Sequence, residues 1–212
     1  MTLRGGALLL SLWAISGVAT VQTCDDPKKS RQWKDFVQQW GRSEPTSGSL
    51  RQLGVGETAE SFYLIAELKR NYSGVRLTEG HWYQVDFGHP AIAYGPPSLD
   101  NSGPVEWCDS GVEAELDGWS ASKLTSGQKF IHAVSRPVSR YYPARLYSVV
   151  GAVEGKWFSK VDLGVLNDEL SSHPFRAEGD GELYLFANDV ALKYDNNHGY
   201  VVVAITRVVP PQ

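Results

Sequence analysis

The sequence predicts an all-β protein whose main domain is an antiparallel β-sandwich, preceded by an N-terminal amphipathic helix. Two observations point to this fold class. From Ala59 onward, short runs of β-branched and aromatic residues are separated by Gly, Asn, Asp and Pro, which is typical of strands joined by turns. These runs are irregularly spaced and show no helical pattern between them, which favours a sandwich over a sheet with crossover helices.

The composition is that of a folded domain that does not bind nucleic acid. The chain has 212 residues, of which 42% are hydrophobic, enough to form a sizeable core. It carries 20 Lys and Arg against 24 Asp and Glu, a net charge of −4, and no segment concentrates basic residues. Because binding to phosphate backbones requires clustered cations, we expect no nucleic-acid partner.

Residues 1–19 are typical of a secretory signal peptide. Arg4 precedes an apolar run over residues 7–21 that contains Gly17-Val18-Ala19, a plausible cleavage site. The run is shorter than the roughly 20 apolar residues that span a bilayer as a helix. We therefore expect an exported protein, periplasmic or secreted. The alternative is an uncleaved N-terminal segment that anchors the protein to the envelope.

The chain has two cysteines, Cys24 and Cys108, and both lie beyond the expected cleavage site. In an oxidising compartment they could form a disulfide that ties the N-terminal segment to the middle of the domain. The alternative is two unrelated thiols. Their spacing does not suit a zinc site.

Residues 20–56 are predicted to form a helix and a linker. Asp26 is a plausible N-cap and Pro27 suits the first helical position, so we expect a helix over residues 27–40. The apolar residues of this segment lie three or four apart: Trp33, Phe36, Val37 and Trp40. Residues 41–56 are rich in Gly, Ser and polar side chains and are predicted to be a surface loop.

The β-sandwich domain is assigned to residues 57–212. Its expected strands cover residues 59–68, 81–87, 128–135, 145–153, 182–188 and 199–207. Residues 94–127 form the longest region of weak periodicity. Because long loops in compact domains are often functional, this region is a candidate for contact with a ligand.

The last two expected strands bracket a loop rich in oxygen donors. It carries two carboxylates and three amides, on Asp189, Asp195, Asn188, Asn196 and Asn197. Carboxylate, amide and carbonyl oxygens are the ligands that Ca²⁺ uses in proteins. The alternative is an Asx-rich turn, since Asn and Asp also favour turns for reasons of backbone conformation.

The stretch from Glu182 to Ile205 resembles the C-terminal calcium hairpin of the LecA-like bacterial galactose lectins and of the wider galactose-binding-like sandwich family. The shared pattern is an apolar strand, Asn188-Asp189, a six-residue loop, Asn196-Asn197-His198-Gly199 and a second apolar strand. The turn Tyr94-Gly95-Pro96 and residues 77–85 are similar to the family's distant turn and second strand. The resemblance implies a galactose-binding-like jelly roll.

The resemblance also implies a calcium-dependent, lectin-like protein that binds carbohydrate without a chemical step. Its Ca²⁺ would be held by the side chains of Asp189, Asn196 and Asn197 and by the carbonyls of Lys193 and Tyr94. An open position on the ion would accept a sugar diol. The candidate ligand contacts are Asp189, Val190, Asn196, Asn197 and Tyr94, together with His198, which follows the two asparagines, and Trp107 in the long loop. The aromatic faces of Tyr94, Trp107 or Tyr194 could cover the apolar side of a sugar.

The sequence departs from the family in two places. Residues 99–104 replace the His-Pro-x-Gln segment that contacts the sugar in the lectins, so a preference for galactose is not implied. Residues of about 105–143 form an insertion without a counterpart in the lectins.

Two alternative functions remain open. In one, the protein is a non-enzymatic envelope module that recognises a protein partner, and the ion only stabilises a loop. The other is an enzyme that uses the long loop, but no Gly-x-Ser-x-Gly nucleophile motif is present. The alternating acids Glu113, Glu115 and Asp117 are typical of the solvated face of a strand. We therefore expect no catalytic residues.

Overall fold

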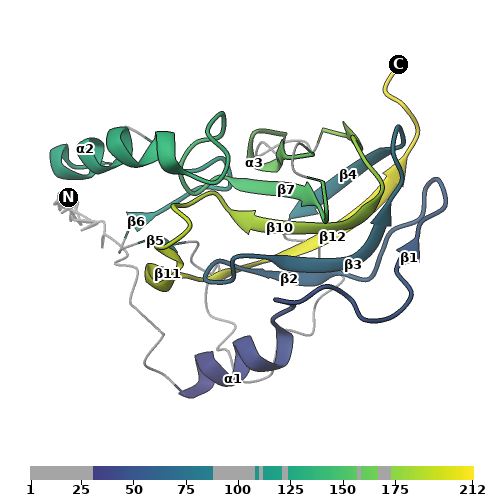
Figure 1. Ribbon diagram of the computed structural model, residues 1–212, viewed down its shortest axis with the longest axis horizontal. Coiled ribbons are helices and arrows are strands. Elements are labelled where there is room, and N and C mark those ends of the chain that lie inside the picture. Colours follow the sequence, from purple (N-terminus) through teal and green to yellow (C-terminus); the bar gives the residue numbers. More distant parts are fainter. Residues whose placement is uncertain (1–30, 88–107, 110–111, 121–123, 157–158, 167–172) are drawn as a thin grey trace, which may run out of the picture.

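In the computed structural model, two β-sheets pack face to face as a sandwich (Figure 1). The structure describes residues 31–87, 108–109, 112–120, 124–156, 159–166 and 173–212. The five-stranded sheet has the order β1 (Arg51–Gln52), β3 (Asn71–Leu77), β10 (Gly181–Ala187), β7 (Val149–Val153) and β8 (Val161–Asp162). The four-stranded sheet has the order β2 (Phe62–Ile65), β12 (Tyr200–Val208), β4 (Trp82–Phe87) and β9 (Phe175–Arg176).

The all-β sandwich predicted from the sequence is confirmed by this strand pairing. All neighbouring strands in the two sheets are antiparallel except β1 and β3, which pair in parallel. A small third sheet at one end has the order β11 (Asn197–His198), β5 (Cys108–Asp109) and β6 (Val112–Glu113).

Alternation along the central strands explains why the sheets stack. In β10, Leu183, Leu185 and Ala187 belong to the core between the sheets, whereas Tyr184 and Phe186 point to the outer face. Successive side chains of a strand point to opposite faces, so a strand with apolar residues on both faces must be covered on both. The main core includes Leu64, Val75, Tyr83, Val85, Tyr147, Val149, Leu183, Leu185, Val203 and Ile205.

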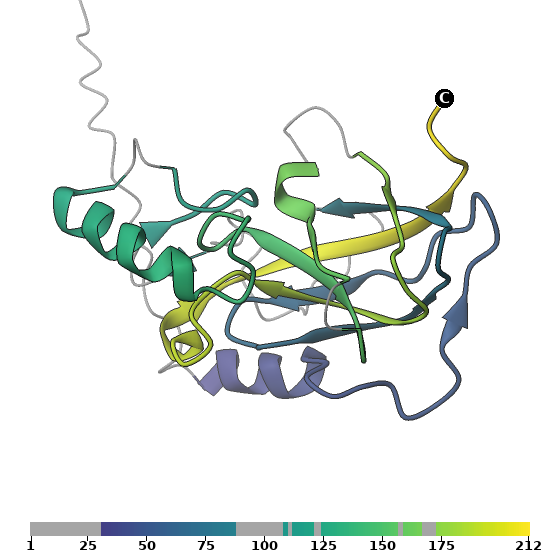
Figure 2. The same ribbon diagram turned by 45° about the horizontal axis from the view of Figure 1, so that its top comes forward.

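Helix α1 (Arg31–Trp40) covers the outer face of the four-stranded sheet (Figure 2). Trp33 and Phe36 pack against Tyr63 and Ile65 of β2, and the indole N–H of Trp33 donates to the Glu67 carboxylate at 2.9 Å. The helix predicted for residues 27–40 is present from Arg31, and residues 27–30 lie outside the described ranges. Within the described residues, no helix is long and apolar enough to span a membrane.

The strand predicted for residues 128–135 is wrong, because this segment is helix α2 (Ser126–Ser135), followed by the short 3₁₀ helix η2 (Arg136–Val138). A reciprocal capping box starts α2. The Thr125 N–H donates to Gln128 Oε1 at 2.8 Å, and the Gln128 N–H donates to Thr125 Oγ1 at 3.3 Å. A further short helix, α3 (Leu163–Leu166), shows that helices do lie between the strands, contrary to the sequence-based expectation.

Residues 77–85 are not one strand, as the family resemblance suggested. β3 ends at Leu77, a turn follows in which the His81 N–H donates to the Thr78 carbonyl at 3.1 Å, and β4 begins at Trp82 in the other sheet. The apolar alternation of β3 is broken by its polar residues, so no strand was predicted there. Gly74 has φ +76°, opposite an irregularity in the register of β10, which is typical of a β-bulge.

The loop predicted as a calcium hairpin does not connect two paired strands. β10 lies in the five-stranded sheet and β12 in the four-stranded sheet, so the intervening chain crosses from one sheet to the other. We call residues 188–197 the crossing loop. It contains the 3₁₀ helix η3 (Tyr194–Asn196) and leads into β11. Both views place this loop and α2 at the same end of the sandwich, opposite the C terminus.

Candidate metal and ligand site

The crossing loop starts with a buried amide that fixes its position. Asn188 is fully buried, and its side chain pairs with both backbone groups of Tyr141: Oδ1 accepts from the Tyr141 N–H at 2.8 Å and Nδ2 donates to the Tyr141 carbonyl at 3.0 Å. Nδ2 also donates to the Arg145 carbonyl at 2.9 Å. The Asn188 amide therefore holds the loop against residues 141–145 and is not a candidate ion ligand.

Asp189 presents a buried carboxylate with one satisfied oxygen. Only 6% of the residue is exposed. Its Oδ1 accepts from the Val190 N–H at 2.6 Å, whereas its buried Oδ2 has no hydrogen-bond partner. Burial raises the pKa of the Asp189 carboxyl, and the negative charge of Asp195 adds to this increase. The Val190 N–H, the Asn197 side chain and the Lys193 charge act in the opposite direction.

Asn197 is a second buried side chain beside Asp189. The residue is fully buried at the start of β11, and its Nδ2 lies 3.5 Å from the Ala66 carbonyl. Its Oδ1 is buried without a hydrogen-bond partner. Because the Asn197 side chain is close enough to lower the pKa of Asp189, the two residues converge, although β11 and β10 belong to different sheets.

The other predicted ligands of the loop are more exposed. Asn196 is half-buried, and its N–H donates to the Lys193 carbonyl at 3.4 Å. The Lys193 side chain is exposed, and the Lys193 N–H donates to the Val190 carbonyl at 2.8 Å. The Lys193 ammonium is thus in solvent, while the Lys193 carbonyl remains on the loop that surrounds Asp189.

Tyr194 is a structural residue and not a stacking platform. Only 4% of it is exposed, its hydroxyl donates to the Ala187 carbonyl, and burial raises its pKa to about 12. The Arg140 guanidinium lies 5.6 Å from the Tyr194 ring centre and donates to the Tyr194 hydroxyl at 3.0 Å. A sugar cannot stack on this ring without displacing Arg140.

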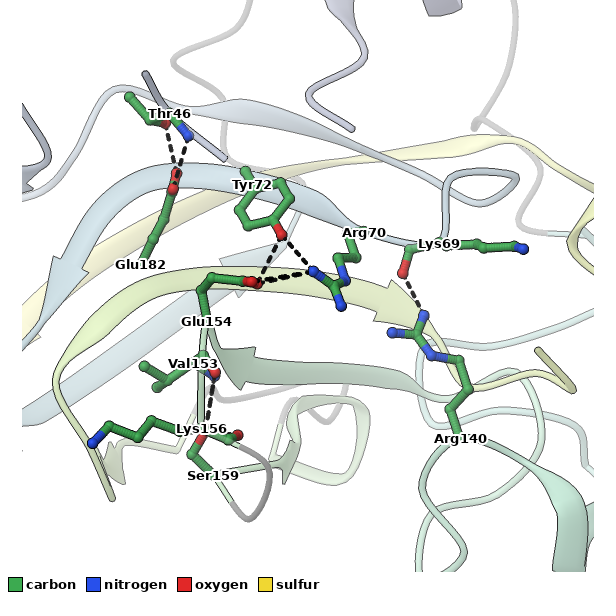
Figure 3. A network of polar contacts seen from close by, with 10 residues as sticks. All are labelled: Thr46, Lys69, Arg70, Tyr72, Arg140, Val153, Glu154, Lys156, Ser159 and Glu182. Carbon is green, nitrogen blue, oxygen red and sulfur yellow. Dashed lines mark hydrogen bonds and ion pairs between the residues drawn. The ribbon is translucent and has the colours of Figure 1, made fainter. Parts of the chain in front are cut away.

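Arg140 comes from the insertion and braces the crossing loop from outside. Its guanidinium carbon lies 3.7 Å from the centre of the Phe186 ring, and it also donates to the Lys69 carbonyl, as Figure 3 shows. The Arg140 N–H donates to the Asp189 carbonyl at 3.2 Å. Sequence reasoning missed Arg140 and Asn188 as structural supports, because the contacts join residues about fifty positions apart and no local pattern marks them.

A second polar cluster lies on the outer face of the five-stranded sheet and serves the fold. Arg70 donates to both the Tyr72 hydroxyl, at 2.8 Å, and the Glu154 carboxylate, and Tyr72 donates to Glu154 at 2.7 Å (Figure 3). The Arg70 guanidinium also covers the Tyr184 ring at 5.1 Å. These groups therefore satisfy one another on the outer face of the sheet.

The remaining predicted site residues are divided between buried and undescribed positions. His198, predicted as a ligand contact, is buried in β11, where its backbone pairs with Cys108 of β5. Tyr94 and Trp107 lie outside the described residues, as do the expected signal peptide and Cys24 of the expected disulfide. The structure therefore brings together Asp189 and Asn197, with Val190, Lys193 and Asn196 on the same loop.

The donor chemistry of this site fits a hard cation. A carboxylate oxygen and an amide oxygen are both buried and lack hydrogen-bond donors, and buried acceptors without partners are rare in folded proteins. A hard cation that reached both oxygens would satisfy them. Among the described residues, no group of three or more His, Cys, Asp or Glu side chains could hold a metal ion, so an ion at this loop would need amide and carbonyl oxygens as further ligands.

Comparisons with known proteins found few matches. No protein-family model matches the sequence, and no curated protein matches it. Among solved structures, the chain is similar to one described as "EclA N-terminal domain; PllA-like lectin", with 15% sequence identity and a TM-score of 0.44. The similarity covers 71% of this chain and 97% of that chain. The β-sandwich assignment follows from the strand pairing in the chain itself.

Proposed function

We propose that this protein binds one Ca²⁺ ion in the crossing loop and uses the ion to bind carbohydrate, without a chemical step. The observation that carries the proposal is the pair of buried oxygens, Asp189 Oδ2 and Asn197 Oδ1, that have no hydrogen-bond donor. The Asp189 carboxylate supplies the negative charge, Asn197 a neutral oxygen, and the loop carbonyls and Asn196 complete the set of candidate ligands.

Electrostatics supports an ion at this point. Burial makes ionisation of Asp189 unfavourable, which the raised pKa of its carboxyl expresses. A divalent cation would reverse this effect, because it stabilises the charged form of the carboxylate. Because the Lys193 side chain is exposed, its ammonium does not fill the space beside Asp189, and another cation can bind there.

Carbohydrate is proposed as the ligand because Ca²⁺ accepts six to eight oxygens, more than the described side chains supply. Open positions on the ion can be filled by two neighbouring hydroxyls of a sugar, which can also hydrogen-bond to the carboxylate and amides. The resemblance of residues 182–205 to the calcium hairpin of galactose lectins adds to this argument. The apolar face of the sugar would require an aromatic residue other than Tyr194.

The bracing of the loop favours a second candidate function. Asn188, Tyr194 and Arg140 already fix the loop through side-chain hydrogen bonds. An ion there could serve only to stabilise this end of the sandwich, in an envelope module that recognises a protein. The two functions differ in whether a sugar responds to the ion.

The test is titration calorimetry with Ca²⁺, followed by a panel of glycans with and without a chelator. Asp189→Asn keeps the shape of the side chain and removes its charge, so it should abolish Ca²⁺ binding and every calcium-dependent glycan signal. Asp35→Asn, an exposed carboxylate on α1, is the matched control and should leave binding unchanged. Ca²⁺ binding without any glycan response would support the structural candidate, and unchanged Ca²⁺ affinity in Asp189→Asn would reject the site.

Export is proposed on the N-terminal sequence alone, from Arg4 and the apolar run over residues 7–21. Mass spectrometry of the protein recovered from an expressing cell should find an N terminus at Thr20. A mass that includes residues 1–19 would favour the anchored alternative.

A further inference from the structure

Helix α2 turns its polar side toward the sandwich and its apolar side toward solvent. The residues that are half-buried against the protein are Gln128, His132 and Ser135, with Ser139 just beyond the helix. No residue of α2 is fully buried. A surface helix of a globular protein normally does the opposite and buries its apolar stripe.

The outward side of α2 forms a contiguous apolar strip. Phe130 is 70% exposed, and Ile131, Val134 and Val138 are each more than half exposed. Residues 130, 134 and 138 are four positions apart, and residue 131 lies three positions before residue 134. This spacing places all four on one side of the helix and its 3₁₀ extension. Single exposed apolar residues are ordinary, but a continuous strip marks an interaction surface. We call these four residues, with Lys129, the α2 surface.

The α2 surface lies in the longest stretch of the sequence without an acidic residue. Between Asp117 and Glu154 the chain has no Asp or Glu, although its net charge is −4. The same stretch contains five cationic residues: Lys123, Lys129, Arg136, Arg140 and Arg145. Arg140 and Arg145 are engaged by the crossing loop and by Asp117, whereas the Lys129 side chain is exposed on α2.

The crossing loop extends the surface at the same end of the sandwich. Ser139, one residue after η2, forms an antiparallel bridge with Val190 of the loop. Two residues further on, Leu192 is 85% exposed and is followed by the exposed Lys193. Both views show α2 and this loop at one end of the molecule. The crossing loop thus adds a second pair of an exposed apolar residue and a lysine, Leu192 and Lys193, to the pair Phe130 and Lys129 on α2.

We propose that the α2 surface docks on an anionic lipid surface. An exposed apolar strip flanked by cations is the arrangement with which amphipathic helices lie in the interface of a membrane that carries negative headgroups. Its apolar side chains would enter the boundary between headgroups and acyl chains, and Lys129 would remain among the headgroups.

The chain itself could supply two other occupants of the α2 surface, a second copy of the protein or the apolar segment over residues 7–21. Charge argues against both. A second copy related by a two-fold axis would place one α2 surface against another, with lysines of like charge facing each other. The apolar segment over residues 7–21 provides no complement, because residues 1–24 contain no acid. An anionic lipid surface offers both an apolar interior and the opposite charge.

The first experiment measures partitioning of the full chain onto vesicles of phosphatidylcholine, with or without phosphatidylglycerol. The double variant Phe130→Ser/Ile131→Ser should bind the anionic vesicles at least about tenfold more weakly, because it removes two apolar side chains from the interface. The double variant Val55→Ser/Val209→Ser changes residues of similar exposure and should match the wild type. Lys129→Glu should weaken binding to anionic vesicles but not to neutral ones. Lys34→Glu on α1, the matched control, should leave binding to anionic vesicles unchanged.

A second measurement reads insertion of α2 directly, so that the N-terminal apolar segment, common to all variants, does not mask it. Phe130→Trp adds fluorescence that brominated anionic lipids should quench, whereas the fluorescence added by Val55→Trp should stay unquenched. Equal quenching in the two variants would overturn the proposal. So would sedimentation showing a dimer that Phe130→Ser/Ile131→Ser dissociates while partitioning is unchanged, since the occupant would then be a second copy.

Discussion

The side-chain amide of Asn188 pairs with both backbone groups of Tyr141, as a neighbouring strand would: it accepts from the Tyr141 N–H at 2.8 Å and donates to the Tyr141 carbonyl at 3.0 Å. This pair joins the end of β10 to the segment that follows α2. The candidate ion site begins at the next residue, Asp189. The geometry of the site therefore depends on a contact between residues 47 positions apart.

The first prediction concerns this contact. Asn188→Ala should lower the free energy of unfolding by about 2 kcal/mol or more, because it leaves backbone groups of Tyr141 without partners in a largely buried place. Urea unfolding in the presence of a chelator measures the loss without any contribution from an ion. Gln39→Ala, an exposed amide on α1, should change stability by less than about 0.5 kcal/mol. A loss no larger than that of the control would contradict the structural role of Asn188.

The second prediction follows from the raised pKa of Asp189. Because burial raises this pKa in the folded state, the folded protein binds a proton at a pH where the unfolded chain has released it. Without Ca²⁺, stability should therefore fall as the pH rises from about 4, the ordinary carboxyl range, through the folded pKa of Asp189. Asp189→Asn should remove this component of the pH dependence.

Ca²⁺ should act in the opposite sense, because it binds the ionised carboxylate. At a free concentration 100 times the Kd, one site contributes about 2.7 kcal/mol, which corresponds to a Tm increase of roughly 5–10 °C for a chain of this size. Thermal unfolding with and without Ca²⁺ should show this increase at pH 7 and its loss as the pH falls through the folded pKa of Asp189. An increase of the same size in Asp189→Asn would place the ion elsewhere.

The third prediction separates the carbonyl of Lys193 from its side chain. Lys193→Thr should leave Ca²⁺ affinity unchanged or slightly higher, since it retains the carbonyl and removes a positive charge that acts on Asp189. Calorimetry on Lys193→Thr and on Lys156→Thr, an exposed lysine in another loop, provides the comparison. A collapse of binding in Lys193→Thr alone would give the ammonium a role in the site.

The fourth prediction tests the packing of α3 against the insertion. A Cβ at Gly164 would lie 1.9 Å from the Leu116 carbonyl oxygen, so Gly164→Ala must shift the backbone and should cost about 3 kcal/mol. A Cβ at Gly127 in α2 would meet nothing within 4 Å, and Gly127→Ala should cost nothing. Similar unfolding midpoints in urea for the two variants would contradict this arrangement of residues 116 and 164.

Much of the sandwich could be predicted because its central strands alternate. The strands predicted for residues 81–87, 182–188 and 199–207 agree closely with β4, β10 and β12. β3 was missed because Asn71, Ser73 and Gly74 interrupt its alternation. These polar residues find partners on β10, more than 100 positions away: Asn71 Nδ2 donates to the Leu185 carbonyl, Ser73 Oγ to the Leu183 carbonyl and the Gly74 N–H to the Glu182 carboxylate. Residues 128–135 were assigned to a strand because a short apolar run, here Phe130 to Val134, fits either structure.

The sequence by itself determined that this chain folds as a β-sandwich with an N-terminal amphipathic helix, and that oxygen donors gather in residues 188–197. These properties depend on local alternation and composition, which can be read along the chain. Only the tertiary structure decided that the loop crosses between two sheets, that Asp189 meets Asn197 while Asn188 turns away to Tyr141, and that α2 exposes its apolar side. Each of these depends on burial and on contacts between distant segments, and neighbouring residues do not encode which of two similar amides becomes a support and which remains an open acceptor.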